Sequence, residues 1–225
     1  MGKKLKKEPK SVEFFLQLDG EQYSLKFNLL KSICHQGYTS EKCMMKGTDI
    51  ALAAFKVDRS DPKFTEEKLK DIKVPPIGFV TPEQIQDLKS DEIRVHGYPL
   101  EVYDPKTQLM GPNENFLYKD EGKLERVNTH GDLSGATAIY AFDEIVTGKG
   151  ESGGPISWSK DGEVDRIVGV HNGNNREFNV GTIINEPLFY DFIIPTLEQL
   201  SADYHQSEAD EQYNQVSRML EEQND

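Results

Sequence analysis

One glycine-rich segment, residues 150–155 with the sequence GESGGP, holds the residue of this chain that is best suited to chemistry. A serine hydroxyl attacks a carbonyl carbon efficiently only where the backbone turns tightly and neighbouring N–H groups point at the oxyanion that forms. Glycine allows such a turn because it adopts backbone angles that other residues avoid. The segment therefore predicts a nucleophile at Ser152. The alternative is a glycine-rich β-turn in which the serine is incidental.

A second segment, residues 47–52 with the sequence GTDIAL, places Asp49 beside a short apolar run. A partly buried carboxylate can orient a histidine base and stabilise its charged form. Together the two segments resemble those of trypsin-like serine peptidases, in which the aspartate precedes the serine. The resemblance implies that Ser152 is the nucleophile, that the N–H groups of Gly150 and Ser152 form an oxyanion hole, and that Asp49 is the partner of the base.

Three further segments carry the same resemblance, which covers about residues 33–195. Residues 35–38 (HQGY) resemble the His-Pro-x-Tyr segment that often precedes the aspartate. Residues 96–99 (HGYP) are similar to the Gly-Tyr-Pro of staphylococcal-type glutamyl endopeptidases, and residues 167–171 (IVGVH) to the strand that lines their substrate cleft. The lack of cysteines beside Ser152 also fits this disulfide-free branch.

The histidine base is missing from its expected place. In the family it lies about forty residues before the aspartate, which here falls in the lysine-rich beginning of the chain. His35 lies 14 positions before Asp49 but matches a different family segment, and the other histidines follow Asp49. Three alternatives stay open: His35 has been recruited as the base, a segment of the first lobe is absent from this chain, or the protein is a relative that has lost catalysis.

Substrate preference is expected to depend on Val146, Thr147 and His171. The resemblance places Val146, six positions before Ser152, where an aspartate would select Arg or Lys, so basic specificity is not expected. Thr147 and His171 resemble the pair that binds the acidic side chain in glutamyl endopeptidases, since a hydroxyl and an imidazole both donate hydrogen bonds. We therefore expect a preference for Glu or Gln. Alternatively, His171 is a strand residue whose hydrogen bonds are satisfied.

Strands are predicted to position these groups, because apolar residues alternate along several segments. Residues 12–18 and 23–30 predict a hairpin around Asp19-Gly20, and residues 50–57 predict a third strand. A short helix is predicted from Thr81 to Leu88, because the sequence TPEQ has the pattern of a helix start. Further strands are predicted near residues 93–95, 116–118, 137–142, 155–158, 166–171 and 180–184.

The predicted fold is mostly β, with two chymotrypsin-like β-barrel lobes of which the first is incomplete, and with a C-terminal helix. The apolar pattern from Leu188 to Leu200 favours that helix, and the acidic residues beyond it are too poor in apolar side chains to bury themselves. The predicted segments are a basic segment (1–11), a partial first lobe (12–73), a connection with the short helix (74–91), a second lobe (92–186) and the C-terminal helix with an acidic tail (187–225).

Charge and composition restrict the partners of this 225-residue chain. A net charge of −13 argues against a nucleic acid bound through its phosphates. Residues 198–225 carry eight acids against Arg218, which leaves the acidic tail as a candidate for a protein partner. No membrane span and no secretory signal is recognised, so we expect an intracellular, cytoplasmic protein. Cys34 and Cys43 lack metal-ligand spacing, and the sequence predicts neither a metal nor a cofactor.

The combined hypothesis is a serine endopeptidase that cleaves a peptide or protein substrate through an acyl-enzyme on Ser152. The rival hypothesis is a non-catalytic module that holds a peptide in the same cleft. The intact glycine-rich turn favours the enzyme, and the missing base favours the binding module.

Overall fold

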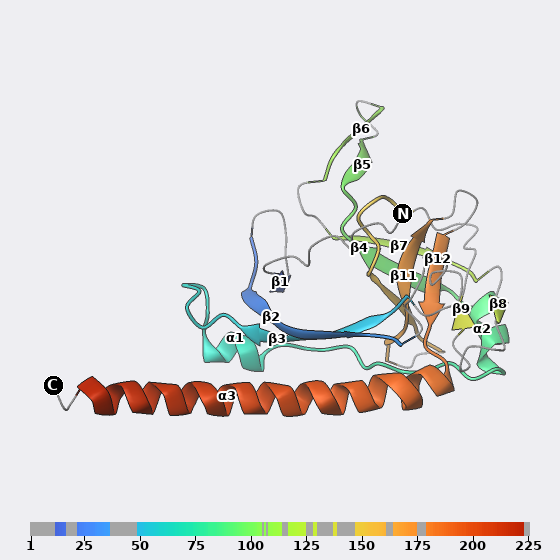
Figure 1. Cartoon of the computed structure of the whole chain (residues 1–225). Coiled ribbons are helices and arrows are strands. Elements are labelled where there is room, and N and C mark those ends of the chain that lie inside the picture. Colours follow the sequence, from blue (N-terminus) through green and yellow to red (C-terminus); the bar gives the residue numbers. More distant parts are fainter. Residues whose placement is uncertain are drawn as a thin grey trace, which may run out of the picture.

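The computed structural model describes residues 12–16, 22–36, 49–104, 106, 108–113, 117–124, 128–129, 137–138, 147–160, 164–174 and 179–222. Within these residues the fold is mostly β, with antiparallel sheets and a long C-terminal helix, as the sequence predicts (Figure 1). One sheet lies in the predicted first lobe and a larger one in the predicted second lobe. The boundaries of the five predicted segments stay a prediction.

The first sheet has three strands, β1 (Glu13–Leu16), β2 (Leu25–Cys34) and β3 (Ala51–Val57), in the order β1-β2-β3. Strands β1 and β2 pair antiparallel, with Phe14 opposite Phe27. The predicted hairpin and the predicted third strand are therefore confirmed. Strand β2 continues beyond its predicted end because β3, and not β1, pairs with its last residues.

The second sheet has seven strands in the order β7-β4-β10-β11-β12-β9-β8. They are β4 (Ile93–Gly97), β7 (Tyr118–Gly122), β8 (Asn128–Thr129), β9 (Thr137–Ala138), β10 (Pro155–Trp158), β11 (Arg166–Asn174) and β12 (Asn179–Ile183). Each of the six strands predicted here has a counterpart, and β10 has the predicted bounds. Strand β8 was not predicted, and residues 139–142 of the strand predicted at 137–142 lie outside the described residues.

The main hydrophobic core is built largely from strands of the second sheet. Its buried residues are Val80, Leu88, Ile93, Val95, Leu124, Ile156, Trp158, Val168, Val180 and Ile183. The residue opposite Ile156 on the neighbouring strand is Gly169, where an added Cβ would lie 2.6 Å from the backbone oxygen of Thr182. Strand β10, which follows the glycine-rich turn, is fixed in the core by the fully buried Ile156.

The sequence pattern did not predict one hairpin and one short helix. Strands β5 (Glu101–Asp104) and β6 (Leu109–Pro112) form a hairpin that projects from the second lobe (Figure 1). Several of its side chains are exposed, so no alternation of buried apolar residues marks it. Helix α1 (Glu66–Lys70) is a single turn in the polar stretch before the connection, capped by the Thr65 hydroxyl, which accepts a hydrogen bond from the Lys68 N–H at 3.2 Å.

The connection between the lobes contains the predicted helix, α2 (Gln84–Ser90). Its start is the capping arrangement expected from the sequence. The Gln84 N–H donates to the Thr81 hydroxyl at 3.3 Å, and the Thr81 N–H donates to the Gln84 side chain at 3.1 Å. Single bridges from Ile77 to Ile167 and from Val80 to Asn185 hold the connection against the second lobe.

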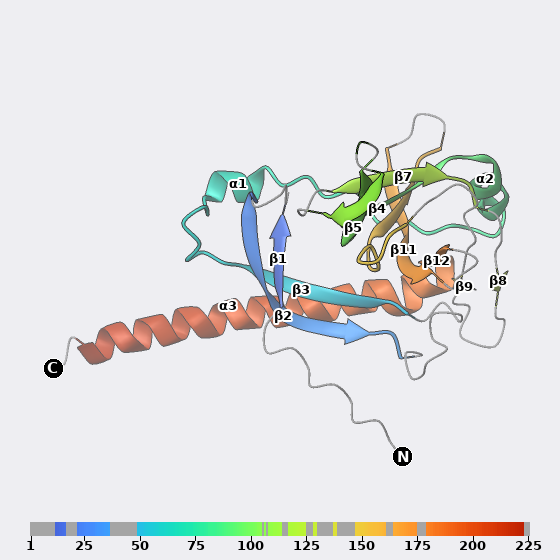
Figure 2. The same ribbon diagram turned by 90° about the horizontal axis from the view of Figure 1, so that it is seen from above.

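The chain ends in a π-helical turn, η2 (Leu188–Ile193), that continues into helix α3 (Ile194–Glu222). Figure 2 shows α3 running beneath β2 and β3, where Lys31 pairs with Asp203 and Lys56 with Glu211, each at 2.6 Å. The predicted helix is confirmed, but it extends through the acidic stretch that the apolar pattern left unassigned. These ion pairs link the extended helix to the first sheet as far as Glu211, and they use two of the acids proposed for a partner. None of the described helices is long and apolar enough to cross a membrane.

Candidate active site

Ser152 is exposed at the centre of a tight turn that leads into β10. The turn requires glycine at two positions, because Gly150 has a φ of 110° and Gly153 a φ of 95°. The Gly153 N–H donates to the His171 carbonyl at 2.7 Å, and the His171 N–H donates to the Gly154 carbonyl at 2.8 Å. The turn that carries Ser152 is thus fixed to strand β11.

The hydrogen bonds inside the turn leave two N–H groups available. The Glu151 N–H donates to the Gly148 carbonyl at 3.3 Å, and the Gly154 N–H donates to the Glu151 carbonyl at 2.9 Å. Among the described contacts, none engages the N–H groups of Gly150 and Ser152. These are the two groups that the sequence resemblance assigns to an oxyanion hole.

Glu151 directly precedes the serine in the turn. The residue is buried, with 6% of its surface exposed, and its carboxylate accepts a hydrogen bond from the Gly148 N–H. Burial raises the pKa of this carboxyl, and the Gly148 hydrogen bond opposes that shift. The acid before the serine therefore stabilises its own loop through a neighbouring backbone group.

A cavity of about 490 Å³ joins Ser152 to the first sheet. Its described lining comprises Cys34, Asp49, Ile50, Ala51, Ser152, Gly153, Val170, His171 and Asn172. The structure therefore brings Ser152, Asp49 and His171 to one cavity, although they lie far apart in the sequence. The catalytic roles that the resemblance implies for Asp49 and Ser152 stay a prediction.

Asn172 connects the two sheets at this cavity. Its side-chain N–H donates to the backbone carbonyl of Asp49 at 2.7 Å, and its amide oxygen accepts a hydrogen bond from the Thr182 hydroxyl at 3.1 Å. Both Asn172 and Thr182 are buried. Sequence reasoning gave Asn172 no role; the available signal was a polar residue directly after His171 on a strand with a buried core face.

His171 is almost completely buried, with 1% of its surface exposed, yet it lines the cavity beside Ser152. Its ring nitrogen Nδ1 is buried without a hydrogen-bond partner among the described residues. Burial lowers its pKa to about 4, so the ring is neutral at neutral pH. The role of His171 in substrate preference stays a prediction.

The rest of the expected specificity pair is arranged differently. The Thr147 hydroxyl donates to the side-chain oxygen of Asn179, at the beginning of β12. Its proton is therefore not available to a substrate, and Thr147 is not among the described residues that line the cavity. Val146 lies outside the described residues. The pairing of Thr147 with His171 stays a prediction.

His35 lies against the C-terminal helical segment. The His35 ring packs edge-to-face on Phe192, with ring centroids 4.9 Å apart. The backbone N–H of His35 donates to the Ile50 carbonyl at 2.9 Å. The residue is buried, and burial lowers the pKa of the ring. It lines a smaller cavity of about 220 Å³ together with residues of η2 and α3. Nothing in this placement supports His35 as the base for Ser152.

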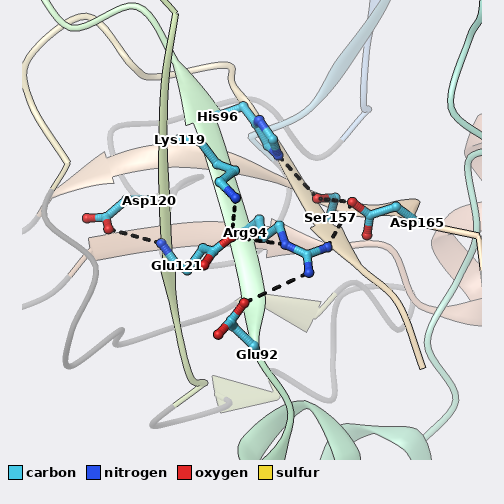
Figure 3. A network of polar contacts seen from close by, with 8 residues as sticks. All are labelled: Glu92, Arg94, His96, Lys119, Asp120, Glu121, Ser157 and Asp165. Atoms are coloured by element: carbon cyan, nitrogen blue, oxygen red, sulfur yellow. Dashed lines mark hydrogen bonds and ion pairs between the residues drawn. The ribbon is translucent and has the colours of Figure 1, made fainter. Parts of the chain in front are cut away.

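A larger cavity of about 690 Å³ reaches the opposite side of the Ser152 turn. It contains a polar cluster in which the Ser157 hydroxyl lies 3.4 Å from the His96 Nε2 atom and 3.3 Å from an Asp165 carboxylate oxygen (Figure 3). Sequence reasoning used His96 only as part of a motif and overlooked Ser157 and Asp165. Its signal was weak because the three residues come from three separate segments.

Comparisons with known proteins give matches only among solved structures. No model of a protein family and no curated protein matches the chain. A thermostable serine protease from an extremophilic microorganism matches at 13% identity with a TM-score of 0.44, over 77% of this chain and 68% of that one. A Glu endopeptidase in complex with MPD matches at 18% identity with a TM-score of 0.49, over 83% and 71%.

The chain resembles serine peptidases in both comparisons. Both likenesses are at low sequence identity. Because both TM-scores are low, this likeness alone assigns neither an activity nor a site residue to the chain. The functional argument depends on the geometry around Ser152.

Replacing Asn172 with alanine should lower the free energy of unfolding by about 1–3 kcal/mol, because the buried Thr182 hydroxyl and the Asp49 carbonyl both lose their partner. Urea unfolding of the full chain measures this change. The control Asn214→Ala, at an exposed position of α3, should change stability by less than about 0.5 kcal/mol. Equal effects of the two substitutions would contradict the proposed connection.

The stability of the chain should fall as the pH decreases from about 6.5 to about 4, because the unfolded state then binds a proton on His171 that the folded state excludes. The full effect is about 3 kcal/mol and is absent above the unfolded pKa. His171→Asn should flatten this part of the profile, whereas His205→Asn, on the surface of α3, should not. Parallel profiles for the wild type and His171→Asn, measured by urea unfolding, would refute the assignment.

Proposed function

We propose that this chain is a serine endopeptidase domain that hydrolyses peptide bonds through an acyl-enzyme on Ser152. The observation that carries the proposal is the state of the turn: an exposed serine, two glycines with positive φ, and N–H groups at Gly150 and Ser152 that no described contact engages. A carbonyl carbon attacked by the hydroxyl would place its oxygen between these two donors. An incidental serine in a turn does not require this combination.

Asp49 supports the same assignment from the other side of the cavity. An imidazole that bridges a carboxylate and a hydroxyl spans roughly 6–8 Å, if each hydrogen bond is about 2.6–3.2 Å long. The shared cavity supplies a place for such a ring between Asp49 and Ser152. No described imidazole hydrogen-bonds the Ser152 hydroxyl, so the reaction requires a histidine that the described residues do not supply.

The substrate residue on the acyl side of the scissile bond would contact His171. A neutral, buried imidazole whose Nδ1 has no partner among the described residues can bind the amide of Gln without a change of charge. It can bind the carboxylate of Glu if the ring takes up a proton. The proposed preference is therefore for Gln or Glu. We expect Glu to gain relative to Gln as the pH falls.

A second candidate function is a non-catalytic module that binds a peptide in the same cleft. The observation in its favour is the missing contact between Ser152 and an imidazole in the described part of the chain. The two functions differ in one property that can be measured directly, which is the reactivity of the Ser152 hydroxyl.

Fluorophosphonate labelling of Ser152 should be weak in this chain alone and strong when a segment with a histidine base is supplied, because the hydroxyl otherwise keeps its proton. In another serine protease, loss of the histidine lowers kcat by a factor on the order of 10⁶. Mass spectrometry of the labelled peptide is the measurement, with Ser152→Ala as the blank. Absence of labelling with every histidine-bearing segment would favour the binding module.

Strong labelling of the chain alone would instead show that it already contains a base. His35→Ala and His96→Ala would then be compared, and the variant that abolishes labelling identifies the base. Retention of labelling in both would exclude these two rings.

Peptide profiling of the active form should show Gln or Glu before the scissile bond, and His171→Ala should reduce that preference more than it reduces cleavage overall. The physical reason is that His171 provides the buried hydrogen-bonding nitrogen of the cavity. A matched control is Thr147→Val, because the Thr147 hydroxyl is engaged by Asn179 and should matter less. A preference for Arg or Lys before the scissile bond would overturn this assignment.

A further inference from the structure

The larger cavity, of about 690 Å³, lies on the side of the Ser152 turn away from Asp49 and His171. One part of its wall is apolar and comes from both lobes: Phe14 and Leu16 of β1, Leu117 before β7, and Ile167 of β11. Phe14 and Leu117 are about half exposed, at 46% and 55%. A wall of this kind suits the methylene groups of a long side chain.

The polar end of the cavity presents hydrogen-bond acceptors. His96, Ser157 and Asp165 line it, with Ser157 buried between the other two (Figure 3). One carboxylate oxygen of Asp165 accepts from Ser157 and from Arg94, whereas the other, Oδ1, is buried and has no hydrogen-bond partner among the described residues. A carboxylate oxygen withdrawn from water without a donor is costly, so this end favours a ligand that brings an N–H group.

The charges around this end favour a cation. Three carboxylates, those of Glu92, Glu121 and Asp165, pair with two cations, Arg94 and Lys119 (Figure 3). Arg94 is shared among all three, at 3.0 Å from Asp165, 3.2 Å from Glu121 and 3.9 Å from Glu92.

His96 adds no positive charge at neutral pH. Burial is the largest cause that lowers the pKa of its ring, so the ring is neutral in this range. The polar end therefore carries an excess of negative charge together with an unpaired acceptor, beside an apolar wall.

The Ser152 turn separates the two cavities. Ser152 and Gly153 line both, with His171 and Asp49 on one side and His96, Ser157 and Asp165 on the other. A peptide that crosses Ser152 therefore places one of its residues in each cavity. If His171 holds the residue on the acyl side, the larger cavity receives a residue on the leaving-group side.

From these contacts the geometry points to a second specificity subsite: the larger cavity binds an Arg or Lys side chain on the leaving-group side of the scissile bond. The apolar wall takes the stem of the side chain, and Asp165 takes its charged head. The inference rests on the proposed function for its direction along the substrate, but not for the binding itself. It adds a basic requirement on one side of the bond to the Gln or Glu expected on the other.

The test uses the full chain with Ser152→Ala, so that binding is measured without any cleavage. Fluorescent peptides carry Gln at the position expected to occupy the His171 cavity. In separate peptides, Arg, norleucine or Glu is placed at the first position after this Gln, and then at the second. Fluorescence anisotropy should give a Kd for the Arg peptide about tenfold lower than for the Glu peptide, with norleucine between them. Equal affinities for Arg and norleucine would overturn the cationic subsite, and equal affinities for all three would overturn the subsite altogether.

Asp165→Asn should remove the preference for Arg, whereas the control Asp203→Asn, a carboxylate on α3 paired with Lys31, should leave it unchanged. Because Asp165 also pairs with Arg94, thermal unfolding must first show that the variant is folded. Two variants at Leu117, half exposed on the wall, avoid that problem. Leu117→Lys should weaken the Arg peptide and Leu117→Glu should strengthen it; the opposite order, or no change, would refute the proposal.

This design separates the two proposals. An Arg preference in Ser152→Ala, together with a wild type that never reacts with the fluorophosphonate probe, would leave the subsite standing and reject hydrolysis. A reactive Ser152 without any Arg preference would reject only the subsite.

Discussion

The candidate site depends on the backbone hydrogen bonds that fix the glycine-rich turn to β11. The Gly153 N–H donates to the His171 carbonyl, and the His171 N–H donates to the Gly154 carbonyl. A side chain at Gly154 would collide with the carbonyl oxygen of His96, so only glycine lets the turn approach β4 this closely. The position of the Ser152 hydroxyl is therefore a property of the second sheet and its packed core, and not of a free loop.

Burial gives the two sides of the turn different electrostatic characters. Near Ser152, desolvation raises the pKa of Glu151 and lowers that of His171, so it favours the uncharged form of both groups. At the polar end of the larger cavity the carboxylates of Asp165 and Glu121 share the Arg94 guanidinium, which offsets part of the cost of removing them from water. One cavity thus suits a neutral or weakly charged group, and the other suits a cation.

Features set by neighbouring residues could be predicted from the sequence, whereas contacts between distant segments could not. Strand β10 and the capping arrangement of Thr81 and Gln84 are local, so the sequence pattern found them. The link from Asn172 to Asp49, and the cluster of His96 with Ser157, join residues that only tertiary packing brings together. No periodicity records such contacts. The motif resemblance placed Asp49 and Ser152 on one cavity because it draws on a family fold, and not because the spacing itself requires it.

The division of the site between the two sheets bears on the missing base. The turn and His171 belong to the second lobe, whereas Asp49 is linked to that lobe through the buried amide of Asn172, which donates to its backbone carbonyl. The proposed nucleophile and the proposed oxyanion donors therefore keep their positions whether or not a histidine lies between Asp49 and Ser152. Since binding of a peptide uses only these preformed parts, substrate recognition can be complete before the base is present. Chemistry and recognition in this fold are then separable, and supply of one imidazole to the cavity is the step that joins them.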